Sequence, residues 1–172
     1  LSASTLILGR VTGVSRPTIG AVFPSERGPC VLLDAGTNVD CRAQHLYEFA
    51  VMGSIYASRY YHRADPTVGL LNVGEEESKG SALTQEAYRL LKRSGLNFIG
   101  NIEGKDILKG KADVVVCDGF VGNIVLKFGE SVPAFLKSRL LQYTGRSFWN
   151  RLRVGLMRTP LRASLKDMDY EE

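Results

Sequence analysis

Short runs of apolar residues recur along the chain, bounded by glycine, proline and acidic residues. Within each run the apolar residues are continuous and do not alternate with polar ones, which is typical of strands buried on both faces of a sheet. The predicted strands cover residues 18–23, 30–34, 67–72, 97–102 and 112–118.

Helical patterns separate several of these runs. Apolar residues recur at spacings of three and four within 46–60, 83–91 and 121–136, as expected of helices with one buried face. Strands that alternate with such helices predict an α/β domain with a largely parallel sheet flanked by helices. The link between the first two strands, 24–29, is rich in turn residues, so part of the sheet is expected to be antiparallel.

The composition fits one soluble globular domain. Of the 172 residues, 44% are hydrophobic and 23% are charged, which is ordinary usage for such domains. No apolar run reaches the roughly 18 to 20 residues that cross a bilayer, and no signal-peptide pattern is present, so we expect a cytoplasmic protein. The chain begins without a methionine, inside an apolar helical pattern, and we expect it to be a piece of something longer.

The positive charge is concentrated towards the end of the chain. The net formal charge is +4, and eight basic residues but no acidic residue lie between 131 and 166. This segment needs its own explanation. We therefore divide the chain into an α/β catalytic region, 1–130, and a basic helical extension, 131–172.

Three polar loops with glycines follow predicted strands: DAGTNVDC (34–41), NVGEEESKG (72–80) and CDGFVGN (117–123). In a parallel sheet such loops converge on one edge, which is where ligands bind in open α/β folds. Glycine allows close approach of the backbone, and N–H groups at a helix N-terminus bind anions. No Walker or GxGxxG motif is present, so nucleotide binding has no direct support.

Structural roles compete for the polar residues of these loops. Asp34 and Asp118 are equally well explained as turn or helix-capping residues. Asn38 and Asn123 are equally well explained as turn residues in the left-handed conformation.

The glutamates at 75–77 stand directly before a predicted helix over 81–93. We expect at least one of them to interact with the dipole of that helix in its first turn. Lys79 lies between these carboxylates and Gly80, which indicates a held ammonium; a solvated lysine is the alternative. Consecutive carboxylates on one loop cannot all point inward, so we expect no metal site.

The usual catalytic nucleophiles have no support. The sequence has no GxSxG motif and only two histidines, His45 and His62, which leaves little for a Ser-His or Cys-His pair. His45 follows the first polar loop and could reach a ligand, although packing alone is the commoner role. The cysteines show neither disulfide nor zinc spacing and are expected to be buried or half-buried: Cys30, Cys41 and Cys117.

Six stretches run in order over residues 5–127: TLILGR, LLDAGTNVDC, FAVMGSIYA, VGLLNVGEEESKG, FIGNIEGKDI and KADVVVCDGFVGNIVLK. With them the sequence closely resembles the bacterial phosphate acyltransferases of phospholipid synthesis, the acyl-acyl-carrier-protein:phosphate acyltransferase (PlsX) family. The resemblance implies the fold of the phosphotransacetylases and isocitrate/isopropylmalate dehydrogenases, a homodimer, and a fragment lacking both ends of the family's chain. Thr37 stands where the family usually has alanine.

The resemblance implies transfer of a fatty acyl group from acyl carrier protein to inorganic phosphate, with no cofactor. Phosphate is itself the nucleophile, so the protein must supply a phosphate site and donors for the developing oxyanion. The predicted catalytic residues are Lys79, Asn38 and Asn123, helped by the glycine amides of the 117–123 loop. The predicted substrate-binding residues are Asp34, Gly36, His45, Glu75, Asp118, Gly119 and Gly122, of which the three acidic ones would orient the donors.

Residues 143–166 interleave apolar and basic side chains in the pattern of an interfacial amphipathic helix. Three interpretations stay open: a dimer or core helix with a solvated basic face, contact with an anionic membrane, and docking of the acidic acyl carrier protein. The residues predicted to make membrane or carrier-protein contact are Trp149, Arg151, Arg153 and Arg158. Nucleic acid is not expected, because no recognition motif is present and residues 1–130 are neutral.

Two alternative functions remain open. One is a phosphotransacetylase that uses an acyl-CoA, and the other is a non-catalytic fragment that dimerises and binds membranes. Members of the resembled family associate peripherally with membranes, so the resemblance also implies peripheral membrane contact and glycerol-3-phosphate acyltransferase as a partner.

Overall fold

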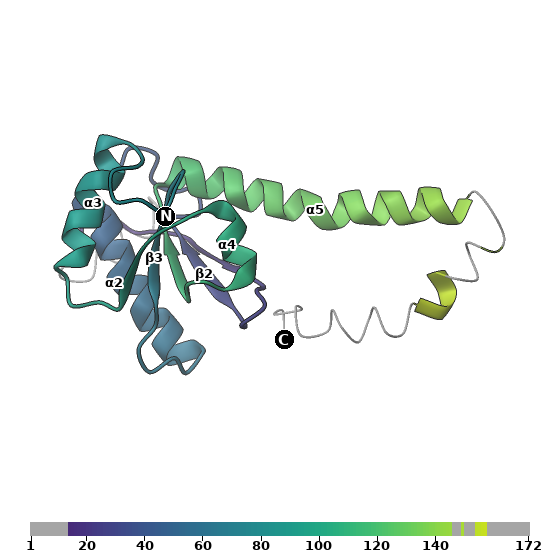
Figure 1. The fold of residues 1–172 in the computed structure, drawn as a ribbon, viewed down its shortest axis with the longest axis horizontal. Helices are drawn as coiled ribbons and strands as arrows, with labels where there is room; N and C mark the ends of the chain where they lie inside the picture. The colour runs from purple at the N-terminus through teal and green to yellow at the C-terminus, as the bar shows by residue number, and fades with distance from the viewer. Residues whose placement is uncertain (1–13, 146–148, 150–153, 158–172) are drawn as a thin grey trace, which may run out of the picture. The chain divides into compact units, whose positions relative to one another are not determined.

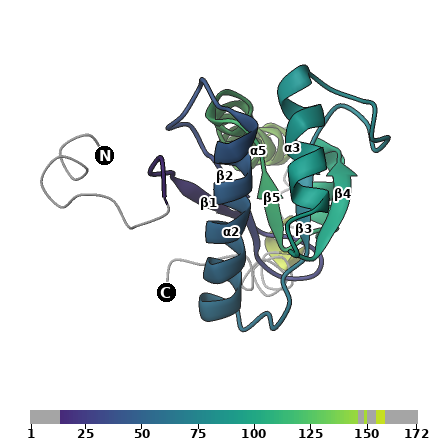
Figure 2. The ribbon, with the colours of Figure 1, turned by 90° about the vertical axis from the view of Figure 1, so that its left-hand side faces the viewer.

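The computed structural model describes residues 14–145, 149 and 154–157 of the chain. Its centre is a five-stranded sheet (Figure 1). The strands lie in the order β1-β2-β5-β3-β4, and Figure 2 labels all of them. The strands are β1 (Gly20–Phe23), β2 (Cys30–Leu33), β3 (Val68–Leu71), β4 (Phe98–Ile102) and β5 (Val114–Val116). All five predicted strands are confirmed, each shorter than predicted by one or more residues.

The sheet is parallel except at one edge. β1 pairs antiparallel with β2, so that Gly20 faces Leu33. β2, β5, β3 and β4 are parallel to one another, with Leu33 and Leu70 both in register with Val116. The prediction of a largely parallel sheet with an antiparallel part is therefore confirmed.

The helices are α2 (Ala43–Tyr60), α3 (Ala82–Lys92), α4 (Gly104–Lys109) and α5 (Gly119–Gly145). The sequence pattern did not predict α4, because six residues are too few to show a helical period. Its ends are nevertheless well marked. The Glu103 N–H donates to the Asp106 carboxylate, and Gly110 ends the helix in the left-handed conformation.

One face of the sheet is covered by α2 and α3 (Figure 2). Phe49 of α2 and Leu91 of α3 are fully buried in a cluster with the side chains of β2, β5 and β3 that point to this face. α2 approaches closely because it carries Gly53, where a Cβ atom would lie 2.5 Å from Val114 and 2.6 Å from Leu33.

The opposite face is covered by α4 and the first turns of α5. Leu32 and Val115 point to this face, as the two-residue alternation of strands requires, and they pack with Ile107 of α4. Val121 and Val125 of α5 pack against the same cluster. The helices that follow β2 and β3 therefore lie on one face, and the helix that follows β5 begins on the other.

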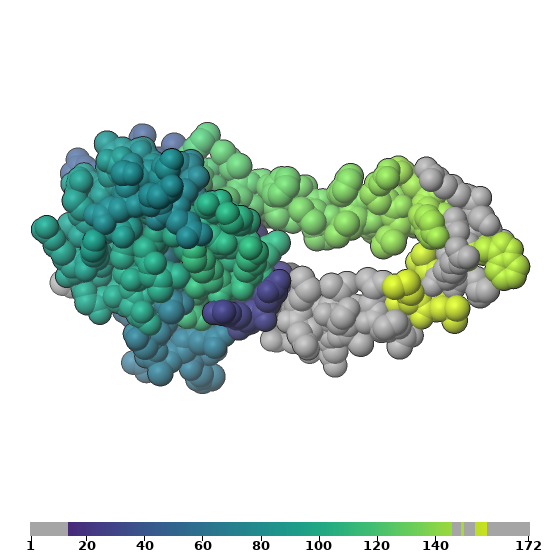
Figure 3. All heavy atoms as spheres, viewed as in Figure 1, coloured from purple at the N-terminus to yellow at the C-terminus, as the bar shows by residue number. Residues whose placement is uncertain are grey.

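The chain divides into two compact units, Leu1–Leu126 and Lys127–Glu172. Segments from β3 to α4, coloured teal to green, make up most of the first unit's surface in Figure 3. In the second unit, α5 continues to Gly145 and exposes Phe128, Phe135 and Leu141. No helix within the described ranges is both long enough and apolar enough to cross a membrane.

Candidate active site

The three polar loops lie at one edge of the sheet. They follow β2, β5 and β3, which are neighbours in the sheet and run in the same direction. The following helices lie on opposite faces of the sheet, and ligands of open α/β sheets bind at such a point, outside the carboxyl ends of the strands. This edge, formed by residues 34–41, 72–80 and 117–123, is termed the loop edge below.

Asp34 organises the first loop. Its side chain is fully buried. One carboxylate oxygen accepts from Thr37 N at 3.0 Å, and the other accepts from Asn38 N and Asn38 Nδ2, both at 2.7 Å. A buried carboxyl with several N–H donors fixes the backbone around it, so Asp34 holds the turn that carries Asn38.

The side-chain amide of Asn38 is already used within the protein. Its Nδ2 also donates to Pro17 O at 2.9 Å, and the residue is 8% exposed. With both amide hydrogens engaged, Asn38 positions the loop and offers no side-chain donor to a ligand. Neither Asn38 nor Asn123 has positive φ, so their alternative explanation as left-handed turn residues is wrong.

The loops after β2 and β5 touch through their backbones. Gly119 N donates to Asn38 O at 2.7 Å, and a Cβ atom at Gly119 would lie 2.7 Å from Asn38 N. A Cβ atom at Gly122 would clash with the carbonyl oxygen of Asp34. The predicted convergence of these two loops is therefore present, and glycine is what permits it.

The amide groups of Gly119 and Gly122, in the 117–123 loop, are not free to bind an anion. Gly119 N donates to Asn38, as described, and Gly122 N donates to Asp118 O at 3.0 Å. The expectation that both donate to phosphate therefore does not fit the geometry. Asp118 caps α5, because its Oδ1 accepts from Val121 N at 2.9 Å.

Asn123 remains available at the loop edge. It lies in the first turns of α5 with its side chain exposed, and it packs against Gly36, where a Cβ atom would lie 3.2 Å from its Cβ. Gly36 has a φ of 122°, in the region that favours glycine. The structure thus brings Asp34, Gly36, Asn38 and Asn123 together.

Hydrogen bonds from two asparagine side chains hold the 72–80 loop, one of them from strand β4. Asn72 Nδ2 donates to Lys79 O at 3.0 Å across the loop, and Asn101 Nδ2 donates to Glu76 O at 2.9 Å. Within the residues that the structure describes, no hydrogen bond or ion pair joins this loop to the other two. Lys79 and Glu75 therefore share the edge with the other site residues but, among the described residues, form no hydrogen bond or ion pair with them.

The glutamates form ion pairs away from the helix start. Glu75 pairs with Lys111 at 2.9 Å, and Glu77 pairs with Lys92 at 3.0 Å. The hydrogen bonds that the two ammonium groups donate to these carboxylates raise the pKa of Lys111 and of Lys92. α3 begins only after Ser81, which caps it, and its first turn contains no acidic residue. The prediction that a glutamate serves the helix dipole is therefore wrong.

Lys79 is not held by the glutamates, contrary to expectation. Among the described residues its ammonium group has no carboxylate within ion-pair distance. Its backbone is fixed, because Lys79 N donates to Glu76 O at 3.0 Å, and its stem passes Gly74, where a Cβ atom would lie 3.1 Å from Lys79 Cγ. An exposed cation on a fixed loop is suited to meeting an anionic ligand.

His45 caps α2. It is 7% exposed, and its Nδ1 accepts from Arg42 N at 3.1 Å. Burial is the main cause that lowers the pKa of the imidazole, and the positive charge of Arg16 lowers it further. The ring is therefore a neutral cap in the first turn of the helix, which matches the packing alternative given for it above.

The segment before β1 also lies at the loop edge, and the sequence pattern did not identify it. Arg16 Nη1 donates to Asp40 O at 2.8 Å, and Ala35 N donates to Ile19 O at 2.8 Å. This placement follows from antiparallel pairing, since the start of β1 must lie beside the end of β2. The turn-rich link at 24–29 predicted this antiparallel pairing. From the pairing, the position of Arg16 at this edge could have been inferred from the sequence.

The thiols are poor nucleophiles in this fold. Burial raises the pKa of Cys41 to about 11 and that of Cys30 to about 12, and it raises the pKa of Cys117 further. A thiol needs a lowered pKa to react near neutral pH. Within the described part of the chain, no cluster of three or more His, Cys, Asp or Glu residues could hold a metal ion.

The predicted contact residues of the extension are only partly visible. Trp149 is 66% exposed, and residues 154–157 are helical, with Leu156 and Met157 exposed. Arg151, Arg153 and Arg158 lie outside the described residues.

Comparison with known proteins identifies close relatives. The family model described as "Fatty acid synthesis protein" matches residues 1–172. A phosphate acyltransferase of Moorella thermoacetica is 48% identical over the whole chain, which corresponds to 51% of that relative. A phosphate acyltransferase of Thermodesulfovibrio yellowstonii is 47% identical over the whole chain and 50% of its own length. The chain therefore spans about half the length of these relatives.

Solved structures show the same fold. The EutD phosphotransacetylase from Staphylococcus aureus superposes with a TM-score of 0.61 at 21% identity, over 76% of this chain and 46% of that one. A phosphotransacetylase from Streptococcus pyogenes gives a TM-score of 0.54 at 21% identity, over 72% of this chain and 44% of that one. The expected phosphotransacetylase-like α/β fold is confirmed.

Proposed function

Since the chain belongs to the fatty acid synthesis protein family, we propose that it carries the phosphate site of a phosphate acyltransferase. The reaction moves a fatty acyl group from the thioester of acyl carrier protein to inorganic phosphate. A phosphate oxygen bonds to the acyl carbon, the carbon–sulfur bond breaks, and the carrier protein leaves as a thiol. The observation that carries the proposal is the match of all 172 residues to relatives named phosphate acyltransferase.

The proposed reaction needs binding and charge stabilisation more than it needs a protein nucleophile. Phosphate is largely ionised at neutral pH and attacks directly, so the protein aligns it and stabilises the oxyanion on the acyl carbonyl. The raised thiol pKa values, with Cys41 at about 11, agree with this division of labour.

We assign phosphate to the cations of the loop edge. Lys79 has no carboxylate partner among the described residues, and Arg16 uses one N–H of its guanidinium on Asp40 O, which leaves its other donors for an anion. Asn123, which packs against Gly36, supplies an exposed amide at the same edge. Asp34, Asn38, Gly119 and Gly122 act by fixing the loops, and Glu75 acts through Lys111 by holding the 72–80 loop.

The extension is proposed to serve partners of the same reaction. Its described part exposes apolar side chains such as Phe128, Phe135 and Trp149, and the sequence adds eight basic residues between 131 and 166. These features support a homodimer, a peripheral contact with anionic membrane lipid, or docking of acyl carrier protein, and through the membrane a meeting with glycerol-3-phosphate acyltransferase. Flotation with anionic and with neutral liposomes tests the lipid contact, which requires binding to the anionic ones alone.

A chimera provides the functional test. The 172 residues replace the matching half of the Moorella thermoacetica relative, and the protein is incubated with phosphate and either acyl-acyl carrier protein or acyl-CoA. We expect acyl phosphate from the carrier-protein donor. A folded chimera that forms none, while the parent relative does, contradicts the proposal.

The phosphotransacetylase alternative rests on the shared fold. It predicts the opposite donor preference in the same assay. Efficient turnover of acyl-CoA with none of acyl-acyl carrier protein would replace the leading proposal by this one.

A further inference from the structure

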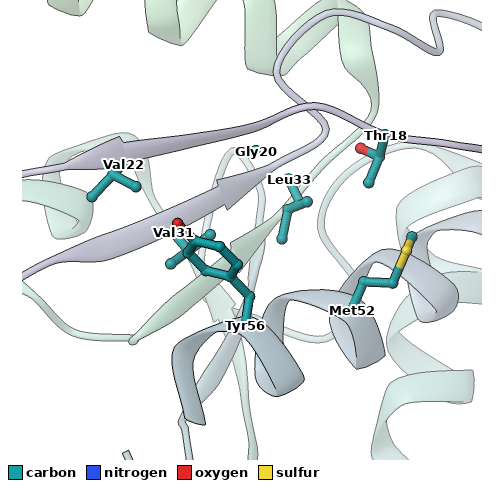
Figure 4. Close-up of a pocket in the computed structure, with 7 residues that line it drawn as sticks. All are labelled: Thr18, Gly20, Val22, Val31, Leu33, Met52 and Tyr56. Atoms are coloured by element: carbon teal, nitrogen blue, oxygen red, sulfur yellow. The ribbon is translucent and has the colours of Figure 1, made fainter. Parts of the chain in front are cut away.

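A cavity of about 250 Å³ lies between the β1–β2 pair and helix α2. Figure 4 shows the two strands forming one wall, with Met52 and Tyr56 reaching towards it from the helix. Its lining residues are Thr18, Gly20, Val22, Val31, Leu33, Met52 and Tyr56. The cavity is termed the slot below, and none of the site residues discussed above lines it.

One end of the slot lies at the loop edge. Leu33 is the last residue of β2 and directly precedes Asp34. Thr18 lies beside it, because β1 runs antiparallel to β2 with Gly20 opposite Leu33. From this end the slot follows the strands to Val22 and Val31, and Thr18 to Val22 spans roughly 13 Å at the usual rise per strand residue.

The lining is apolar apart from the hydroxyl groups of Thr18 and Tyr56. It includes no charged residue, so it offers no positive charge to a phosphate or a nucleotide. Thr18 Oγ1 is buried and has no hydrogen-bond partner among the described residues, and it lies at the end nearest the loop edge. Drug-sized ligands need pockets of roughly 300 Å³ or more, so the volume suits part of a narrow chain better than a compact molecule.

We propose that the slot binds the hydrocarbon chain of the acyl donor. The methyl end points towards Val22 and Val31, and the thioester lies at Thr18, beside the Asp34 loop. A ligand with an apolar tail and a polar reacting head matches a slot that is lined mostly by apolar side chains and has its Thr18 and Leu33 end beside the polar loop edge. This inference rests on the proposed acyltransferase function and adds to it the place of the acyl chain.

The binding test uses the methyl group of Met52 as its reporter. The 172-residue chain, labelled at the methyl groups of its three methionines, is titrated with saturated fatty acids from butyrate to dodecanoate below their micelle concentrations. The Met52 signal shifts saturably, and each added methylene tightens binding about fourfold until the slot is full. The signals of Met157 and Met168, which belong to the extension proposed to contact lipid, report separately on any binding of fatty acid outside the slot.

Two kinds of variant distinguish binding of the hydrocarbon chain of the fatty acid from binding of its polar head group. Val22→Trp fills the slot and removes the dependence of affinity on chain length, and Val22→Phe serves if the larger residue prevents folding. Ile55→Trp is the control: it also introduces a tryptophan, on helix α2 beside the slot, at a residue that is 58% exposed and does not line the slot, and it leaves binding unchanged. Thr18→Val weakens every fatty acid by the same factor, between about twofold and tenfold.

The proposal is overturned if the Met52 signal does not move, if affinity is independent of chain length, or if Val22→Trp and Ile55→Trp behave alike. Its failure is distinct from failure of the proposed function. Binding at Met52 with no acyl phosphate from the chimera would leave the slot in place and remove the acyltransferase. Acyl phosphate formation without binding at Met52 would support the acyltransferase function and overturn the assignment of the acyl chain to the slot.

Discussion

Among single residues, Asp34 has the most interactions at the loop edge. Its buried carboxylate accepts hydrogen bonds from Thr37 N, Asn38 N and Asn38 Nδ2. These bonds decide where Asn38 O lies, and Asn38 O in turn receives Gly119 N. Asp34, which the sequence predicted to bind substrate, therefore fixes the backbone of two loops, and we propose that it acts on substrate only through them.

Replacing Asp34 by asparagine should destabilise the fold. One carboxylate oxygen becomes an NH₂ group that faces N–H donors, leaving buried donors unpaired, and the free energy of unfolding should fall by about 1 to 3 kcal/mol. Urea denaturation measures the change. Asp40→Asn is the matched control on the same loop, because Asp40 is exposed, and it should change stability by less than about 0.5 kcal/mol. Equal effects of the two substitutions would contradict the role given to Asp34.

Lys79 makes the sharpest prediction for activity. In the chimera, Lys79→Ala should raise the KM for phosphate and lower kcat, with a combined loss of about a hundredfold, typical of losing one charge-stabilising group. Lys79→Arg should restore part of it, since the positive charge remains. Lys109→Ala, at an exposed lysine of α4, should have no effect. Initial rates at varied phosphate concentration measure KM and kcat. If neither constant changes in the Lys79→Ala variant, Lys79 is not part of the phosphate site.

His45 links stability to pH. Its pKa in the folded chain is lowered by burial, so the unfolded state binds the proton more tightly and stability is lost as the pH falls below about 6.5. His45→Asn keeps an acceptor for Arg42 N but does not titrate. Between about pH 7 and about pH 5.5 the wild-type chain should lose stability more steeply than this variant. Urea denaturation at each pH measures the free energy of unfolding. If the wild-type chain and the variant lose the same amount between the two pH values, His45 contributes nothing to the pH dependence.

Between elements, glycine sets how closely the loop after β2 and the start of α5 approach. The amide and carbonyl groups of Asn38 and Asp34 lie where side chains of residues 119 and 122 would otherwise be. This contact joins the helix that covers one face of the sheet to the loop that leads into the helix on the other face.

Gly122→Ala tests this contact. A Cβ atom there clashes with the carbonyl oxygen of Asp34, and the displacement of backbone should cost about 1 to 3 kcal/mol of unfolding free energy. Gly104→Ala is the control, because a Cβ atom at Gly104 meets nothing within 4 Å. Thermal or urea unfolding compares the two. A Gly122→Ala variant as stable as the control would show that the loops separate readily.

For the whole molecule, much of the architecture could be predicted from the sequence. The continuous apolar runs predicted all five strands, because strands buried on both faces need apolar residues throughout. The loop edge followed from the parallel order. The pairing of Glu75 with Lys111 and the use of the Asn38 amide by Pro17 depend on contacts between distant segments, and no local pattern encodes those partners. α4 was missed because it is only six residues long.

We propose that phosphate attacks the thioester directly at a site built from these loops. The most direct measurement follows free thiol, acyl phosphate and the mass of the protein when the chimera meets acyl-acyl carrier protein with and without phosphate. If phosphate attacks directly, thiol appears only with phosphate, in equal amount to acyl phosphate, and the protein never gains the mass of an acyl group. Thiol release without phosphate, together with an acylated protein, would contradict it.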